Sequence, residues 1–302
     1  MLKQEMNLLH VKHILLLVLL LCLPWHGYAK KKPAAVQLTA EDQARFRYYF
    51  YEAERLYLNE QFADAALLFR FCLMLNEEDP MVNQFMGDLA NAYRLSASAL
   101  PYYERSYRAD PKNERILERL AYTYTDTGNY KQALRMCDLL DQRDGYDMNA
   151  AWRRYTVHLK CGHPKQARKA LEDYLALDPT YMPFLLARLT LMETYGAKEK
   201  DMLAAYEQIL SLDENNYVVQ NNYAYFLATH KGDLKLAEQL SYRSLQADPR
   251  NPIFLDTYAW ILYLQGEKQL ATLYIRQAVQ LSEQGVPDEV KQHYQTITGT
   301  EL

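Results

Sequence analysis

Apolar residues along this chain recur with a period of 34 or 35 positions. A column of small residues consists of Ala65, Ala99, Ala133, Ala167, Met202, Ala237 and Ala271. Twelve or thirteen positions before each of these lies a second, mostly small or aliphatic column. Four positions after each lies a column that includes Phe69, Tyr103 and Tyr206. Small residues let two helices approach closely, and larger apolar residues fill the space beside them. The pattern predicts pairs of α-helices repeated in series.

Helix-breaking residues lie where such pairs would begin and end. Prolines follow the second helix of several repeats, at Pro111, Pro179 and Pro249, and glycines separate the two helices at Gly128, Gly162, Gly196, Gly232 and Gly266. Proline cannot continue the helical hydrogen-bond ladder, so it ends the second helix. Thr39 is predicted to cap the first helix, and Pro287 is predicted at the first position of a last helix that covers the final repeat.

Two turns carry the most specific pattern, Gly128 to Ala133 and Gly266 to Ala271. They resemble the turn between the helices of the tetratricopeptide repeat family, and the resemblance extends over about residues 46–285. It implies an all-α fold, a right-handed superhelix of about seven helix-turn-helix repeats with a C-terminal capping helix. Solenoids of this kind offer an extended binding surface, so the resemblance implies a protein that is not an enzyme.

The first 29 residues have the composition of a secretory signal peptide. Lys3 and Lys12 precede an apolar run over residues 14–23, and small residues at Gly27 and Ala29 suit a signal peptidase. Ten residues span roughly 15 Å as a helix, about half of a bilayer core. We therefore expect a signal peptide at 1–29, a lead-in segment at 30–44, the repeat array at 45–285, and a capping helix and tail at 286–302.

Cysteine use leaves two questions open. Cys22 would become the acylated residue of a lipoprotein, but Leu21 stands where a lipobox has a small residue, so plain export is preferred and lipid anchoring is the alternative. Of the three remaining cysteines, Cys72 and Cys137 fall on the inner side of second helices, where free thiols are expected. A disulfide between Cys137 and Cys161 stays open, because sequence does not fix the distance.

Charge and motifs exclude several functions. The net charge is −4 for the chain and −5 without residues 1–29, which argues against nucleic-acid binding. No phosphate-binding loop, dinucleotide turn, nucleophile elbow or paired-cysteine zinc motif is present, and no cofactor is expected. His158, Cys161 and His163 are spaced as metal ligands could be, but a packing role for them is the preferred interpretation.

The family resemblance also implies a ligand-binding face. In tetratricopeptide repeats, certain positions of the first helix face the concave side, and this tyrosine-rich chain places aromatic and polar residues there. The predicted partner-binding residues are Tyr57, Asn91, Tyr122, Trp152, Asn221, Tyr225, Asp256 and Trp260. Rigid aromatic rings beside amides suit an extended peptide. For Trp260, packing against the next repeat is an equal alternative.

Two stretches, Asn221 to Gly232 and Asp256 to Gly266, resemble the paired C-terminal repeats of exported bacterial tetratricopeptide proteins. We therefore expect a non-catalytic scaffold or adaptor of the periplasm or outer envelope that binds a protein or peptide. The alternatives are a glycan- or small-ligand-binding protein and a self-associating structural component. The sequence identifies neither the partner nor the oligomeric state.

Overall fold

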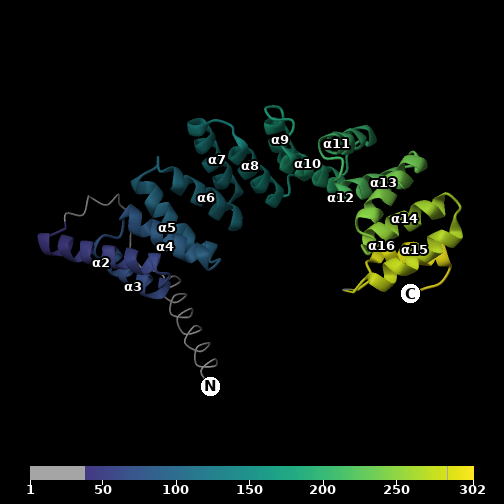
Figure 1. The fold of residues 1–302 in the computed structure, drawn as a ribbon. Helices are drawn as coiled ribbons and strands as arrows, with labels where there is room; N and C mark the ends of the chain where they lie inside the picture. Colours follow the sequence, from purple (N-terminus) through teal and green to yellow (C-terminus); the bar gives the residue numbers. More distant parts are fainter. Residues whose placement is uncertain (1–37, 284) are drawn as a thin grey trace, which may run out of the picture. The chain divides into compact units, whose positions relative to one another are not determined.

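A computed structural model describes residues 38–283 and 285–302, which form fifteen α-helices and no β-strand (Figure 1). The predicted signal peptide and the start of the lead-in segment lie outside the described residues. The helices, in chain order, are α2 (Ala40–Leu58), α3 (Phe62–Leu75), α4 (Pro80–Ala92), α5 (Ser96–Ala109), α6 (Glu114–Asp126), α7 (Tyr130–Asp144), α8 (Met148–Lys160), α9 (Pro164–Leu175), α10 (Met182–Tyr195), α11 (Glu199–Leu212), α12 (Tyr217–Thr229), α13 (Leu234–Ala247), α14 (Pro252–Leu264), α15 (Lys268–Leu281) and α16 (Asp288–Thr298).

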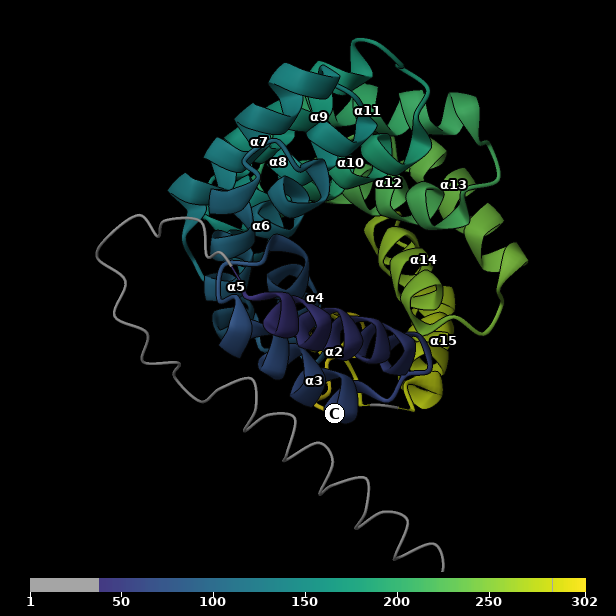
Figure 2. The same ribbon diagram turned by 90° about the vertical axis from the view of Figure 1, so that its left-hand side faces the viewer.

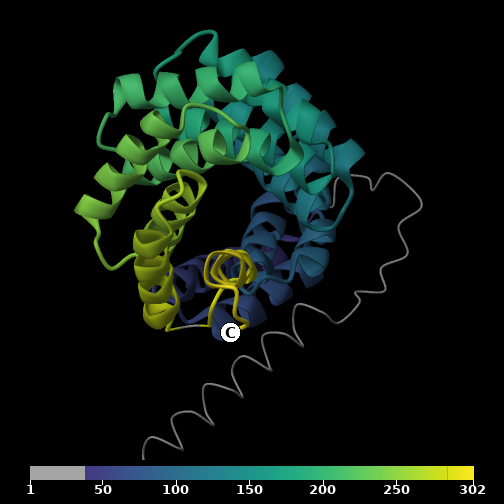
Figure 3. The same ribbon diagram turned by 90° about the vertical axis from the view of Figure 1, so that its right-hand side faces the viewer.

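The chain comprises two compact units, residues 1–174 and 175–302. The described part of the first unit runs from α2 to nearly the end of α9, and the second unit contains α10 to α16. Within each unit, consecutive helices lie side by side, as Figures 2 and 3 show from two further directions. We call the first helix of each repeat helix A and the second helix B.

The seven helix pairs, α2 with α3 through α14 with α15, match the predicted repeats, so the predicted all-α repeat fold is confirmed. Every alanine of the 34-residue column is fully buried in a helix B, and Met202, the exception to alanine, is 4% exposed. The small side chains therefore lie where helices cross, as the spacing requires. The helix α2 begins at Ala40, five residues before the predicted start of the array at residue 45.

Gly87 shows how closely the helices of one repeat approach. A Cβ atom at this position of α4 would lie 2.5 Å from Cε1 of Tyr103 on α5. The Tyr103 ring is fully buried, and its hydroxyl donates a hydrogen bond to Oδ1 of Asp88 at 2.8 Å. Arg119 on α6 donates to the same oxygen from Nε, also at 2.8 Å. Asp88 therefore joins the second repeat to the third.

The turn between helices A and B places one residue in the left-handed region in every repeat. Glycine fills this place at Gly128, Gly162, Gly196 and Gly266, whereas the other three repeats use Glu60, Arg94 and Lys231, with φ between 56° and 59°. Gly232 lies between α12 and α13 as predicted, but Lys231 has the positive φ there, and this loop is one residue longer than the others. Non-glycine residues in this region are strained.

Asn and Asp side chains begin most A helices. Asp79, Asn113, Asp147, Asn216 and Asn251 each accept a hydrogen bond from a backbone N–H two or three residues ahead, which satisfies free donors of the first turn. The predicted cap at Thr39 is confirmed, since its Oγ1 accepts from the N–H of Asp42 at 3.1 Å.

One proline differs from its predicted position at a helix start. Pro287 is the N-cap of α16 and not its first helical residue. The correction is a shift of one position at a helix start, where proline is tolerated because the first N–H groups have no helical partner.

The last helix, α16, packs against both α14 and α15. Its Val290 and Ile297 are buried in a core with Leu255 of α14 and Ile275 of α15. This contact covers apolar surface of the seventh repeat, as a terminal cap must. In the part of the chain that the structure describes, no helix combines the length and hydrophobicity needed to cross a membrane.

Candidate functional site

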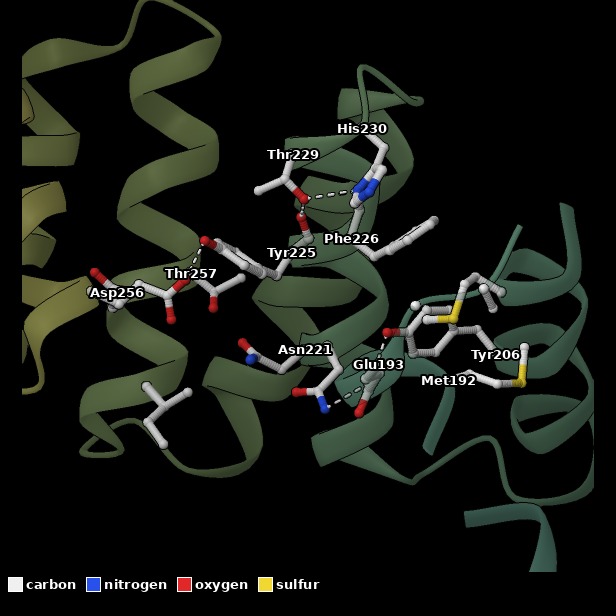
Figure 4. Close-up of a pocket in the computed structure, with 16 residues that line it drawn as sticks. Met192, Glu193, Tyr206, Asn221, Tyr225, Phe226, Thr229, His230, Asp256 and Thr257 are labelled. Carbon is white, nitrogen blue, oxygen red and sulfur yellow. Dashed lines mark hydrogen bonds between the residues drawn. The ribbon is translucent and has the colours of Figure 1, made fainter. Parts of the chain in front are cut away.

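A pocket of about 420 Å³ lies in the second unit, on the side formed by the A helices of repeats five to seven (Figure 4). The helix A of each of these repeats contributes to it, and α11, the turn after α10 and α16 complete the wall. The sixteen lining residues are Met192, Glu193, Gly196, Ala197, Met202, Tyr206, Asn221, Asn222, Tyr225, Phe226, Thr229, His230, Ile253, Asp256, Thr257 and Glu289.

Two tyrosine–glutamate pairs are part of this wall. The Tyr206 hydroxyl donates to Oε1 of Glu193 at 2.7 Å, and the Tyr225 hydroxyl donates to Oε1 of Glu289 on α16. Asn222 also donates to Oε1 of Glu193, at 3.3 Å. Burial, together with the neighbouring carboxylate, raises the pKa of Tyr206 and of Tyr225. Both hydroxyls therefore stay protonated and orient the carboxylates across the pocket wall.

A third carboxylate of the pocket is paired within the protein. Asp256 on α14 is 5% exposed, and both its oxygens lie 3.0 Å from Nδ1 of His293 on α16. Burial raises the pKa of Asp256, while the hydrogen bond from His293 opposes that shift. The His293 ring stacks on Trp260, with the ring centroids 4.2 Å apart. Asp256 and Trp260, both predicted to bind a partner, are thus covered by the chain's own last helix.

Asn221 is the most deeply buried polar residue of the pocket wall. Its side chain is 2% exposed, and its Oδ1 atom has no hydrogen-bond partner among the described residues. An amide oxygen accepts two hydrogen bonds, and leaving a buried one without any costs roughly 1–3 kcal/mol. A buried acceptor without a partner in a pocket wall is a candidate contact for a ligand.

Aromatic rings form a further part of the pocket wall. The rings of Phe226 and His230 stack with centroids 4.0 Å apart, and Tyr206 lies 5.7 Å from Phe226. Nδ1 of His230 faces the carbonyl oxygen of Phe226 at 3.0 Å and Oγ1 of Thr229 at 3.1 Å. These contacts fix the His230 ring against Phe226.

The other predicted partner-binding residues belong to the first unit. Tyr122 on α6 and Trp152 on α8 are both 44% exposed, while Tyr57 and Asn91 are half-buried. The Tyr57 ring packs at 5.1 Å on Phe85, and burial raises its pKa. The pocket therefore brings together Asn221, Tyr225 and Asp256 but holds no predicted residue of the first unit.

Sequence reasoning missed several residues that define the pocket. Glu193 lies near the end of α10 in the least regular repeat, and Glu289 lies on the capping helix, outside the repeat positions from which the predicted face was taken. Tyr206 belongs to helix B, in the apolar column four positions after the small residues, and that column predicts packing between helices and not ligand binding. No repeat-based rule selects these residues, because Glu193 meets Tyr206 inside the irregular repeat five and Glu289 reaches Tyr225 from the capping helix.

The histidine–cysteine cluster of the fourth repeat shows no metal-binding arrangement. The His158 and His163 rings lie 6.4 Å apart between centroids, and burial lowers the pKa of His158. Among the described residues, no group of three or more His, Cys, Asp and Glu side chains could hold a metal ion. Cys72, Cys137 and Cys161 are free thiols in the structure.

Comparison with known proteins gives the fold family a name. Residues 96–153 match the family model described as tetratricopeptide repeat. This stretch of the chain is therefore similar to tetratricopeptide repeats. A solved structure of the C-terminal part of a TPR repeat-containing protein from Cytophaga hutchinsonii superposes with a TM-score of 0.64 at 15% identity, covering 82% of this chain and 98% of the other. A tetratricopeptide repeat protein from Parabacteroides merdae gives 0.50 at 14% identity, covering 84% and 99%.

Two similar proteins carry the same repeat in their names. TPR repeat-containing protein YpiA of Bacillus subtilis is 25% identical over 248 residues, which cover 80% of this chain and 56% of that protein. A TPR repeat-containing protein of Pseudomonas aeruginosa is 24% identical over 205 residues, covering 65% and 33%. The chain thus spans about half of one relative's length and a third of the other's. Tetratricopeptide repeats generally bind protein partners and are typically not catalytic.

Proposed function

We propose that this tetratricopeptide protein is an exported scaffold of the cell envelope that binds a peptide segment of a partner protein in the pocket of repeats five to seven. The observation that carries the proposal is the pocket itself, in which A-helix residues of three repeats meet. It offers aromatic surface for apolar side chains and the free acceptor of Asn221 for a backbone or side-chain donor. The amino-terminal sequence pattern supports export, with a lipoprotein as the alternative.

The exposed aromatic residues of the first unit fit a second contact region for the same partner. Tyr122 and Trp152 lie on A helices and keep nearly half of their surface exposed. Large rings of this kind dominate binding energy when a partner covers them.

The experiment is cross-linking and co-purification from envelope fractions, followed by binding of the identified partner to the purified protein. Thr229→Trp fills the pocket from an exposed position of α12 and should abolish partner binding. Thr296→Trp on α16 is the matched control, since this threonine is also exposed and also bonds its own helix four residues back. Retained binding in Thr229→Trp would refute the pocket as the site.

The first unit is tested with Tyr122→Ala combined with Trp152→Ala. Tyr242→Ala is the control, because this tyrosine is 45% exposed but lies on a helix B. The double variant should weaken binding while the control does not. If the double variant binds the partner as tightly as Tyr242→Ala does, the first unit does not contact the partner.

A small-molecule ligand is the second candidate. The pocket volume of about 420 Å³ is within the usual range for such ligands, and aromatic rings stack well on sugars. Calorimetric titration with envelope glycans separates the two candidates. If the ligand is a small molecule, a glycan should give saturable binding heat, and Thr229→Trp should abolish that heat.

A further inference from the structure

The pocket of repeats five to seven contains acidic groups but no lysine or arginine. Of its sixteen lining residues, Glu193, Asp256 and Glu289 are acidic, and none is lysine or arginine. Asp256 is paired with His293, whereas Glu193 and Glu289 have no ion-pair partner among the described residues. Lys291, the nearest base in sequence to Glu289, pairs with Asp288 at 2.8 Å. The negative charge of Glu193 and Glu289 is therefore not balanced within the described protein.

The hydrogen-bonding groups of the pocket have a common character. The Tyr206 hydroxyl donates its hydrogen bond to Oε1 of Glu193, and the Tyr225 hydroxyl donates to Oε1 of Glu289. Oε2 of each carboxylate remains as an acceptor. The buried Oδ1 of Asn221 is a third acceptor without a partner, and it is independent of the acidic residues. A ligand that fits these atoms supplies hydrogen-bond donors, and lysine and arginine side chains supply donors only.

The apolar part of the wall suits the stem of the same side chains. Phe226 presents ring surface, and the buried side chains of Tyr206, Met192 and Met202 line the pocket beside it. A cation over an aromatic ring is attracted by the ring's negative face, and the methylene stem of lysine or arginine packs on apolar surface. His230 is the only lining residue that can become positively charged, and its Nδ1 faces the Phe226 carbonyl.

From these observations we infer that the pocket binds a lysine or arginine side chain of the partner's peptide segment, with Glu193, Glu289 and Oδ1 of Asn221 accepting its hydrogen bonds. The inference rests on the proposed function, since it names the residue type that the peptide must place in the pocket. It makes the partner a basic segment, in keeping with the net negative charge of this chain.

The test is a screen of random 12-residue peptides for binding to the purified protein, with Thr229→Trp as the pocket-blocked reference. Peptides that bind the protein but not the reference should share a lysine or arginine. Replacing that residue by glutamine should weaken binding at least about tenfold, as expected for losing a charge-assisted contact. The affinities are measured by fluorescence anisotropy of the labelled peptide.

Charge-neutral variants of the protein give the second arm. Glu193→Gln and Glu289→Gln keep an acceptor for the tyrosine hydroxyl but lose the charge, and each should weaken the basic peptide about tenfold without affecting its glutamine version. Glu207→Gln is the matched control, because Glu207 accepts from the Tyr223 hydroxyl at 3.3 Å in the same way but lies outside the pocket. The control should bind the basic peptide like the unmodified protein.

The outcomes separate the inference from the proposed function. Pocket-dependent peptides without a shared basic residue would overturn the inference and leave peptide binding intact. A basic peptide that binds Glu193→Gln, Glu289→Gln and Glu207→Gln equally well would also overturn it. If no peptide distinguishes the protein from Thr229→Trp, peptide binding in the pocket fails, and the inference fails with it.

Discussion

Replacing Gly87 by alanine tests the close helix contact of the second repeat. Alanine is normally the better residue inside a helix, by about 1 kcal/mol. Here its Cβ would lie within 3 Å of three atoms of the Tyr103 ring, which is fully buried and held by Asp88. Overpacking a buried contact costs roughly 1–3 kcal/mol, and three short contacts place this case at the upper end. We therefore expect a net destabilisation of about 2 kcal/mol, since the clash outweighs the propensity gain.

The assay is equilibrium urea unfolding followed by circular dichroism, with hydrogen exchange to locate the loss in α4 and α5. Repeat arrays can unfold in parts, so exchange in the second repeat is the more specific measure. The control is Gly87→Ala in a Tyr103→Leu background, where the ring is gone and alanine should stabilise the helix. An unchanged or raised stability of Gly87→Ala alone would show that the ring moves without cost, and would refute the reasoning.

Three further predictions follow from other contacts. His293→Ala should destabilise α16 by roughly 1–3 kcal/mol, because it leaves the buried Asp256 carboxyl group without its hydrogen-bond partner. Hydrogen exchange of α14 and α16 measures this, and unchanged exchange contradicts it. Arg94→Gly should stabilise the protein by about 1 kcal/mol by relieving its left-handed conformation at φ 58°, which a lower urea midpoint would disprove. Burial raises the pKa of Cys72 to about 12 and of Cys137 to about 11, so both thiols should resist a thiol reagent at pH 8 until the protein unfolds.

The repeat pattern predicted the helix pairs well because two helices cross in the same way in each repeat. The alanine column marks a crossing of two helices, and a crossing tolerates only small residues, so the signal survives in the sequence of every repeat. Turn residues were less predictable. Arg94 and Lys231 hold a conformation that glycine holds elsewhere, so the position is visible only through its spacing from the neighbouring repeats.

The candidate site was predicted only in part, for a different reason. The positions taken from family resemblance included Asn221 and Tyr225, which do line the pocket. The same positions in repeat seven gave Asp256 and Trp260, which contact His293 of α16. A capping helix is not a repeat, so its packing partners follow from surface complementarity and not from a period.

By itself, the sequence determined the all-α class, the seven helix pairs and the buried small residues, because these depend on local periodicity and on contacts between neighbours in the chain. Only the tertiary structure decided which A-helix residues remain available to a ligand. The hydrogen bond from Tyr225 to Glu289 joins residues 64 positions apart, and such a contact depends on how α16 folds against the array. The acidic pocket exists for the same reason, since its carboxylates come from α10, α14 and α16.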